Sequence, residues 1–230
     1  MRKIRLWQAA MVLFGSFAAT VLAVLPPEMA DLVKVKSRHL DEVYLLPGTD
    51  FKAYKKVMID PAQVSFAKNW MRDMNDQRGS MGGGKRITPE DVKKVTDEAR
   101  KGFGEIFAAA FKQAGVEVVS ENGPDVLRLT PAVINIYVNA ATAGSSATRT
   151  YVMSAGQAAF ALAVRDSVGG TLLGLALDRR ETRSAMAGPV MTNGVVNRAE
   201  FEVLFKQWAQ IAVKGFKGLQ ESPPVAEKKK

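Results

Sequence analysis

Few residues of this 230-residue chain are of the types that carry out chemistry. The chain has no cysteine and one histidine, which excludes thiol catalysis, disulfides, thiolate metal sites and a zinc cluster with two imidazoles. The histidine, His39, lies near the start of the chain, and no Gly-x-Ser-x-Gly nucleophile motif occurs. The sequence therefore predicts no catalytic residue, no metal ligand and no bound cofactor.

Carboxylates are the remaining candidates for catalysis, because a pair of them can act as acid and base in hydrolysis. Five lie near the ends of expected strands: Asp60, Glu121, Asp125, Asp166 and Asp178. Nothing in their spacing selects a pair. A carboxylate-dependent periplasmic hydrolase therefore stands as the alternative to a protein without enzymatic activity.

Residues 160–182, FALAVRDSVGGTLLGLALDRRET, contain an Arg-Asp pair and an Asp-Arg-Arg triplet. Two nearly uncharged runs on either side of a Gly-Gly pair predict a β-hairpin with a loop at residues 167–170. With Val164 opposite Leu173, the large apolar side chains share one face of the hairpin and the small ones share the other. We therefore expect a buried hairpin with this register.

In this register the charges lie at two separate ends of the hairpin. Asp178 is opposite Ala159, and the two acids Asp166 and Asp178 are then roughly 23 Å apart at about 3.3 Å per residue. They cannot act as a catalytic pair. If the hairpin has an interaction role, we expect it at Asp166 or at the exit formed by Asp178, Arg179 and Arg180.

A glycine-rich segment, GSMGGGKR at residues 79–86, has the spacing of a phosphate-binding loop. Arg86 stands where that motif needs a hydroxyl group to hold Mg²⁺, and the segment before Gly79 is polar instead of a buried strand. We therefore interpret this segment as a connector.

The first thirty residues predict export. A basic start is followed by an uncharged run from Leu6 to Leu25 and by Pro26-Pro27, a pattern typical of a signal peptide at residues 1–23, cleaved after Ala23. The alternative is an uncleaved inner-membrane anchor, because about 20 uncharged residues can span a bilayer. Both interpretations predict a periplasmic or envelope-associated protein.

Capping signals and apolar spacing predict two long helices. Thr88, Pro89 and Asp91 open the first, and Gly115 ends it after about 25 residues. The second opens at Asn197 and carries one apolar stripe. Strands are predicted before the first helix, with a break at a proline, and between the two helices: 54–66, 116–120, 125–140, 150–166 and 171–182.

This order of elements predicts an α+β fold, with a mostly antiparallel sheet of four to five strands and the two long helices packed on one face. We expect a single domain at residues 51–220. An irregular segment at 24–50 precedes it, and a flexible basic tail at 221–230 follows.

Several of these segments together resemble a family of Gram-negative envelope proteins. The segments are LPGTDF with YKKVMIDPAQVSF, ITPEDVKK, DVLRLTPAVINI, VRDSVGGTLLGLALDRRET and FKQWAQ, in this order, over about Tyr44 to Leu219. The family is catalogued as domain of unknown function 3313. Its members are often lipoproteins, whereas this chain has no cysteine to lipidate. The resemblance implies an envelope location and an α+β fold, and brings no established activity.

The sequence thus predicts an exported envelope-associated protein that acts as a non-enzymatic binding or structural module. Its expected partner is an envelope protein or the cell wall. No nucleic-acid partner is expected, because the net charge of +9 is spread along the chain and lies partly in the tail.

Overall fold

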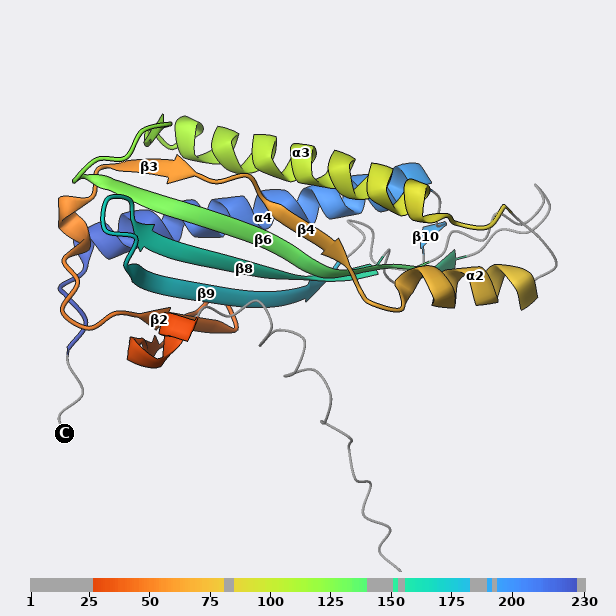
Figure 1. Ribbon diagram of the computed structural model, residues 1–230, viewed down its shortest axis with the longest axis horizontal. Coiled ribbons are helices and arrows are strands. Elements are labelled where there is room, and N and C mark those ends of the chain that lie inside the picture. The colour runs from red at the N-terminus through yellow and green to blue at the C-terminus, as the bar shows by residue number, and fades with distance from the viewer. Residues whose placement is uncertain are drawn as a thin grey trace, which may run out of the picture.

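A computed structural model of the chain describes residues 27–80, 85–139, 151–152, 156–182, 190–191 and 194–226. Figure 1 shows a long twisted sheet with two long helices, α3 (Pro89–Gln113) and α4 (Gly194–Glu221), beside it. A shorter helix, α2 (Trp70–Ser80), extends from one end. Within the described ranges, no helix has both the length and the apolar character needed to cross a membrane.

The main sheet has eight strands in the order β1-β2-β9-β8-β6-β3-β5, with β4 also pairing with β6. The pairs among β3, β4, β5 and β6 are parallel, and the others are antiparallel. Two further strands, β7 and β10, pair with each other. The strands are β1 Val33–Val35, β2 Glu42–Leu45, β3 Lys56–Ile59, β4 Gln63–Phe66, β5 Glu117–Val119, β6 Val126–Val138, β7 Tyr151–Val152, β8 Gly156–Asp166, β9 Leu172–Glu181 and β10 Val190–Met191.

The expected mostly antiparallel α+β sheet of four to five strands is therefore wrong, because the main sheet is mixed and has eight strands. The parallel pairs arise because the chain leaves β3 and β4, crosses over through α2 and α3, and enters β5 and β6 in the same direction. Two further strands, β1 and β2, lie within the segment 24–50 for which irregular structure was expected. They have three and four residues, too few for an alternating pattern to stand out.

The predicted signals at the start of α3 are confirmed. Thr88 and Asp91 form a capping box, Pro89 is the first helical residue, and the helix has 25 residues. Gly115 follows its end with a φ of 77°, a conformation that glycine adopts without strain. The start of α4 differs from the prediction, because this helix begins at Gly194 and Asn197 lies inside it.

Aromatic side chains from both long helices meet the same face of the sheet. Phe103, Phe107 and Phe111 of α3 and Trp208 of α4 are fully buried. Phe160 of β8 lies between the helices, with its ring centroid 5.3 Å from that of Trp208. Complete burial of such a side chain contributes about 2–3 kcal/mol, so these rings fix both helices on the sheet.

The β8–β9 hairpin is present, but its predicted register is wrong by one residue. Val164 lies opposite Gly174, not Leu173, and the register shifts between Val164 and Arg165. The cause is the neighbouring strand β2. A Cβ atom on Gly174 would lie 3.0 Å from Cδ2 of Leu45, so Leu45 occupies the space that a larger residue opposite Val164 would need.

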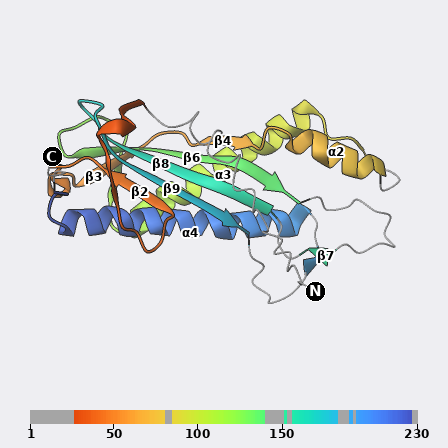
Figure 2. The same ribbon diagram turned by 90° about the horizontal axis from the view of Figure 1, so that it is seen from below.

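The opposite face of the sheet is covered at one end by the start of the described chain. The short 3-10 helix η1 (Pro27–Asp31) and Leu32 pack near Leu172 and Leu175 of β9. Figure 2 shows η1 in front of the sheet and α3 behind it. At the other terminus, the backbone N–H of Gly48 donates to the carbonyl of Val225 at 3.0 Å, so part of the expected tail contacts the domain.

Candidate functional site

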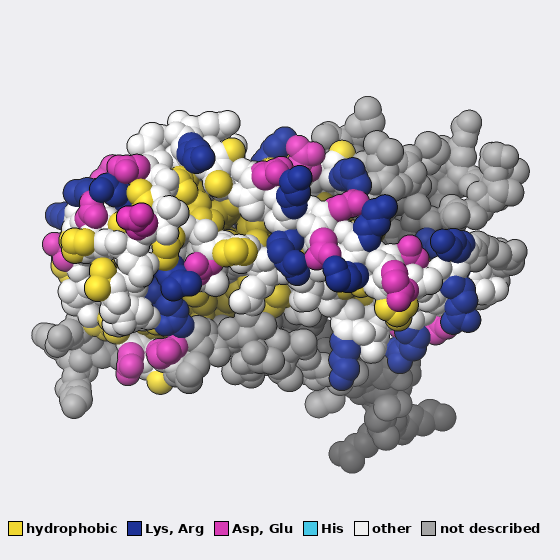
Figure 3. Space-filling model, turned by 45° about the horizontal axis from the view of Figure 1, so that its top comes forward, with side chains coloured by type: hydrophobic (Ala, Val, Ile, Leu, Met, Phe, Trp, Pro, Cys, Tyr) yellow, Lys and Arg dark blue, Asp and Glu magenta, His cyan; other side chains and the backbone are white. Residues whose placement is uncertain are grey.

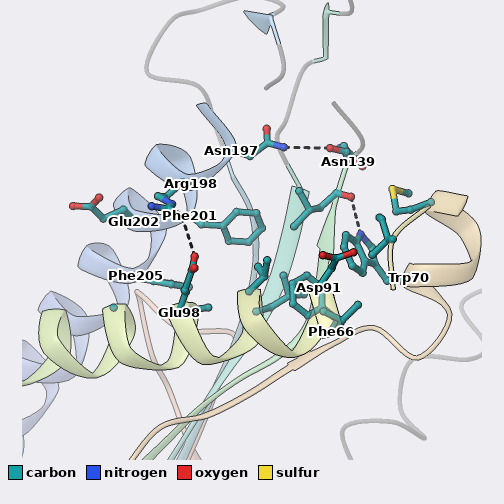
Figure 4. A pocket seen from close by; sticks show the side chains of 18 of the residues that line it. Phe66, Trp70, Asp91, Glu98, Asn139, Asn197, Arg198, Phe201, Glu202 and Phe205 are labelled. Atoms are coloured by element: carbon teal, nitrogen blue, oxygen red, sulfur yellow. Dashed lines mark hydrogen bonds and ion pairs between the residues drawn. The ribbon is translucent and has the colours of Figure 1, made fainter. Parts of the chain in front are cut away.

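A pocket of about 1200 Å³ opens at the end of the sheet from which α2 extends. Its walls come from α2, the N-terminal half of α3, the last residues of β6 and the start of α4. Figure 4 shows Phe201 and Phe205 on one side of this space and Phe66 and Trp70 on the other. The pocket is therefore formed by elements that are far apart in the sequence.

Trp70 attaches the start of α2 to the sheet. Its indole N–H donates to the carbonyl of Val138, at the end of β6, at 2.9 Å. Its ring lies 4.4 Å from that of Phe66, at the end of β4. Because the buried indole is both hydrogen-bonded and packed, it holds one wall of the pocket in place.

Asn75 closes the outer end of the same wall. Its side-chain amide donates to the carbonyl of Ile87 at 2.9 Å, and its side-chain oxygen accepts from the N–H of Ile87 at 2.8 Å. This pair of bonds fixes residues 85–88 along α2, directly before the capping box of α3. Two residues of the expected connector, Lys85 and Arg86, thus line the pocket. Its central residues 81–84 lie outside the described ranges.

The apolar residues of α3 contact two regions, the core and the pocket. Phe103, Phe107 and Phe111 pack into the core beneath the helix. Other apolar residues of the helix line the pocket: Val92, Val95, Ala99 and Ile106. Ala99 and Ile106 also pack against the core. Val95 is 46% exposed. An apolar ligand in this pocket would cover it.

Charged side chains surround the apolar lining. On the α4 side, Arg198 donates to Glu98 at 2.9 Å, and Glu202 pairs with Lys206 at 2.7 Å. On the α2 side lie Arg78, Lys85 and Arg86; an Nη atom of Arg78 donates to the carbonyl of Lys85 at 2.7 Å. Within the part of the chain that the structure describes, none of these three cations forms an ion pair.

One carboxylate lies close to these cations. Asp91 accepts hydrogen bonds from the backbone N–H and the hydroxyl of Thr88, at 3.0 and 3.1 Å. These bonds hold the pKa of Asp91 below its usual range, with a smaller contribution from nearby Lys85 and Lys94. The charged form of Asp91 is therefore used to cap α3.

Asp166, the first residue predicted for an interaction, lies where β8 meets the hairpin turn. Its carboxylate accepts from the backbone N–H groups of Val168 and Gly169 and from the hydroxyl of Tyr54, the last at 3.0 Å. Burial, followed by the bond to this carboxylate, raises the pKa of Tyr54 to about 12. The carboxylate thus organises the turn and joins it to Tyr54.

Asp178, Arg179 and Arg180 lie near the other end of the hairpin, and Asp178 is buried. Its carboxylate accepts from the indole of Trp208 at 2.7 Å, from Nε of Arg180 at 2.6 Å and from the backbone N–H of Asp41 at 3.2 Å. Arg180 also donates to the carbonyl of His39 at 2.6 Å. This cluster fastens residues 39–41 to β9 and α4.

Arg179, the last of the predicted interaction residues, donates to the side chain of Gln157 at 2.6 Å. The two acids of the hairpin lie far apart. Asp178 lies opposite Phe160, six residues along β8 from Asp166, which places the two acids about 20 Å apart at about 3.3 Å per residue. Neither acid borders the pocket.

The other candidate carboxylates are distributed along the sheet. Asp60 accepts from Arg128 at 2.9 Å and from the hydroxyl of Thr130, and Asp125 pairs with Lys56 at 3.4 Å. Glu121 is exposed after β5. Among the described residues, no three acidic or histidine side chains are placed to hold a metal ion.

The pocket itself was not predicted. Its aromatic and apolar residues on α3 and α4 follow the helical spacing of ordinary packing faces, and nothing in that spacing shows where a helix extends past the sheet. The one available signal was the position of Trp70 beside a glycine-rich, basic segment, which brings an aromatic ring and three cations close together in sequence.

Comparison with known proteins finds a family and weak similarity to solved structures. A protein of Xanthomonas campestris assigned to the DUF330 family shares 12% identity over 73% of this chain and 86% of its own, with a TM-score of 0.44. The PelC dodecamer from Paraburkholderia phytofirmans shares 12% over 73% and 94%, with a TM-score of 0.35. No curated protein matches the chain.

The family match covers most of the chain. The family model for a protein of unknown function, DUF3313, matches residues 28–212, which include every wall of the pocket and both ends of the hairpin. The resemblance noted in the sequence is thereby confirmed, and the chain belongs to the DUF3313 family of proteins of unknown function.

Proposed function

We propose that this protein is exported to the cell envelope and acts there as a binding module without enzymatic activity. The pocket between α2, α3 and α4 is its binding site. The observation that carries this proposal is the apolar lining of that pocket, with Val95 left 46% exposed. Concave apolar surfaces with a few polar groups at the edge are typical of ligand sites.

The export part of the proposal rests on the N-terminal pattern, a basic start followed by the uncharged run from Leu6 to Leu25. The expected partner is a component of the envelope. Figure 3 supports a partner other than nucleic acid, because Lys and Arg are interspersed with Asp and Glu on the face shown.

The contacts of the carboxylates argue against the hydrolase alternative. Asp166 and Asp178 each accept several hydrogen bonds from the fold itself. Asp60 and Asp125 each face a cation. A general acid or base needs a free oxygen within reach of substrate, whereas these groups are used to join elements of the structure.

Two glycines of α3 provide a direct test of the binding site. Gly102 lines the pocket and Gly104 does not. A Cβ atom at either position would have no heavy atom within 4 Å, so a side chain can be added at both without a clash at its first atom. We expect Gly102→Leu to weaken binding of an uncharged fluorescent apolar probe at least tenfold, and Gly104→Leu to leave it unchanged.

Equal probe binding by both variants would place the apolar site elsewhere and overturn the proposal for the pocket. The export part is tested separately, by cell fractionation with mass measurement of the N-terminus. A full-length product in the cytoplasm would contradict it, whereas a periplasmic product beginning at Val24 or a membrane-bound full-length product would support it.

A further inference from the structure

The charges around the pocket are divided between its two ends. On the α2 side, three cations, Arg78, Lys85 and Arg86, lie with one carboxylate, Asp91. On the side of α4 and the following turns of α3, two cations lie with three carboxylates: Lys101, Arg198, Glu98, Glu105 and Glu202. Only the α2 side therefore has an excess of positive charge.

The cations on the α2 side have unused capacity to bind an anion. Nε of Arg78 is buried and has no hydrogen-bond partner, and an unsatisfied donor of this kind is unfavourable. Lys85 and Arg86 are exposed and form no ion pair in the described part of the chain. Asp91 offsets only part of this charge, because its single carboxylate, which caps α3 through Thr88 and attracts Lys85, faces three cations.

We propose that the pocket binds a single-chain lipid with an acidic headgroup, an inference that rests on the binding function proposed above. The apolar chain lies between Trp70 and Phe66 on one side and Phe201 and Phe205 on the other (Figure 4). The headgroup lies at the α2 side, beside Arg78, Lys85 and Arg86, where its oxygens accept charge-assisted hydrogen bonds.

The distribution of charge favours a lipid over an amphipathic helix of another protein. Such a helix carries polar groups along its whole length, whereas the pocket has an excess of positive charge at one side only. The lining also includes Ile136 and Val138 at the end of β6, so an apolar chain can contact the sheet as well as the helices. One charged end and one uncharged chain are the features of a single-chain acidic lipid.

The proposal is tested with ligands that share one chain and differ in the headgroup. Dodecyl phosphate, dodecan-1-ol and inorganic phosphate are each titrated against the folded chain with the uncharged fluorescent probe bound, and displacement of the probe is measured. We expect dodecyl phosphate to bind at least tenfold more tightly than dodecan-1-ol, with a preference that falls as salt screens the charges. Inorganic phosphate alone should displace no probe.

Two matched variants assign the preference to the α2 side. Replacing Arg78, Lys85 and Arg86 by Gln should abolish the tenfold preference, because each exposed charge contributes a few-fold in affinity. Replacing Lys36, Lys52 and Lys214 by Gln removes the same charge from exposed positions outside the pocket and should preserve it. If both variants lose the preference for dodecyl phosphate, the preference depends on the net charge of the protein and not on the pocket, which would overturn the proposal.

The outcomes separate this inference from the proposed function. Equal binding of dodecyl phosphate and dodecan-1-ol, both lost in Gly102→Leu, would overturn the acidic headgroup and leave the apolar site standing. Failure of the probe and of every chain to bind would overturn both. Displacement of the probe by an acidic amphipathic peptide, but not by dodecyl phosphate, would replace the lipid with a protein partner.

Discussion

Two arginine–carboxylate pairs lie at α4, and they differ in burial far more than in length. Arg180 and Asp178 both belong to β9, and Asp178 reaches α4 through the indole of Trp208, whereas Arg198 and Glu98 join α4 directly to α3. Arg180 and Asp178 are 2.6 Å apart, with 30% and 4% of their side chains exposed. Arg198 and Glu98 are 2.9 Å apart, with 77% and 47% exposed. The first pair lies beneath the middle of α4, and the second lies at the edge of the pocket.

The difference in burial indicates what each pair contributes. Asp178 has three donors directed at it and no access to water that could replace them, so the fold depends on its charge. Glu98 and Arg198 remain hydrated, and such pairs contribute little to stability. The pocket edge is therefore the part of the molecule where charges are available to a ligand.

The largest effect is expected from Asp178→Asn. The amide keeps the shape of the carboxylate but presents an NH₂ group to some of the donors of Trp208, Arg180 and Asp41. We expect a loss of about 3 kcal/mol in the free energy of unfolding, measured by urea denaturation. Hydrogen exchange should also accelerate in residues 39–41, which this cluster holds.

Asp97→Asn is the matched control for that change. Asp97 has two cationic partners, Lys93 and Arg100, at 2.7 and 2.9 Å, but lies exposed on α3. We expect a change of less than about 0.5 kcal/mol. Equal losses in the two variants would show that the number of partners, and not their burial, decides the stability of these clusters.

An intermediate effect is expected from Tyr54→Phe, which removes the half-buried bond to Asp166. We expect a loss of about 1.5 kcal/mol at pH 8, because the acceptor is charged. The pKa of Tyr54 is raised from 10.0 to about 12 in the folded chain. Its contribution is therefore complete below pH 10 and lost as the pH rises towards 12.

Urea denaturation of both proteins from pH 8 to about 11.5 checks this sign. The difference in unfolding free energy between the natural chain and Tyr54→Phe should shrink above pH 10. A difference that stays constant over this range would contradict the bond between Tyr54 and Asp166. The charge of Asp166 would then contribute little to stability, as in the exposed ion pairs.

The comparison also shows which features a sequence can predict. The limits of α3 followed from Thr88, Pro89 and Gly115, since capping is a local property. The hairpin followed from alternation, but its register depends on Leu45, which lies more than a hundred residues away from Gly174 in the sequence. The parallel pairs and the burial of Asp178 likewise depend on contacts that only the folded chain brings together.

The pocket was missed for the same reason. Val95 and Phe201 have the spacing of core residues, and whether such a residue also lines a pocket depends on how α2, α3 and α4 pack around the end of β6. The charges that were singled out in the hairpin are used by the fold, whereas Lys85 and Arg86, in a segment interpreted as a connector, border the pocket.

A smaller effect is expected at the cap beside the pocket. Thr88→Ala removes the hydroxyl that accepts from the N–H of Asp91 at 3.2 Å. We expect a loss of about 1 kcal/mol in unfolding free energy, with Thr88→Ser retaining most of the stability because it keeps the hydroxyl. If Thr88→Ser is as unstable as Thr88→Ala, the methyl group of Thr88, and not its hydrogen bond, is what stabilises this end of α3.

The smallest effect is expected from Glu98→Gln, at the exposed pair that opened the comparison. Water already solvates both partners, so their attraction is offset by the loss of side-chain freedom. We expect a change below about 0.5 kcal/mol in unfolding free energy, and less still in high salt. α3 and α4 are held by the rings of Phe103 and Phe205, 5.1 Å apart, and this packing is unaffected by the substitution. A loss as large as that of Asp178→Asn would mean that the pair at the pocket edge holds the two helices together, and the charges there would no longer be free for a ligand.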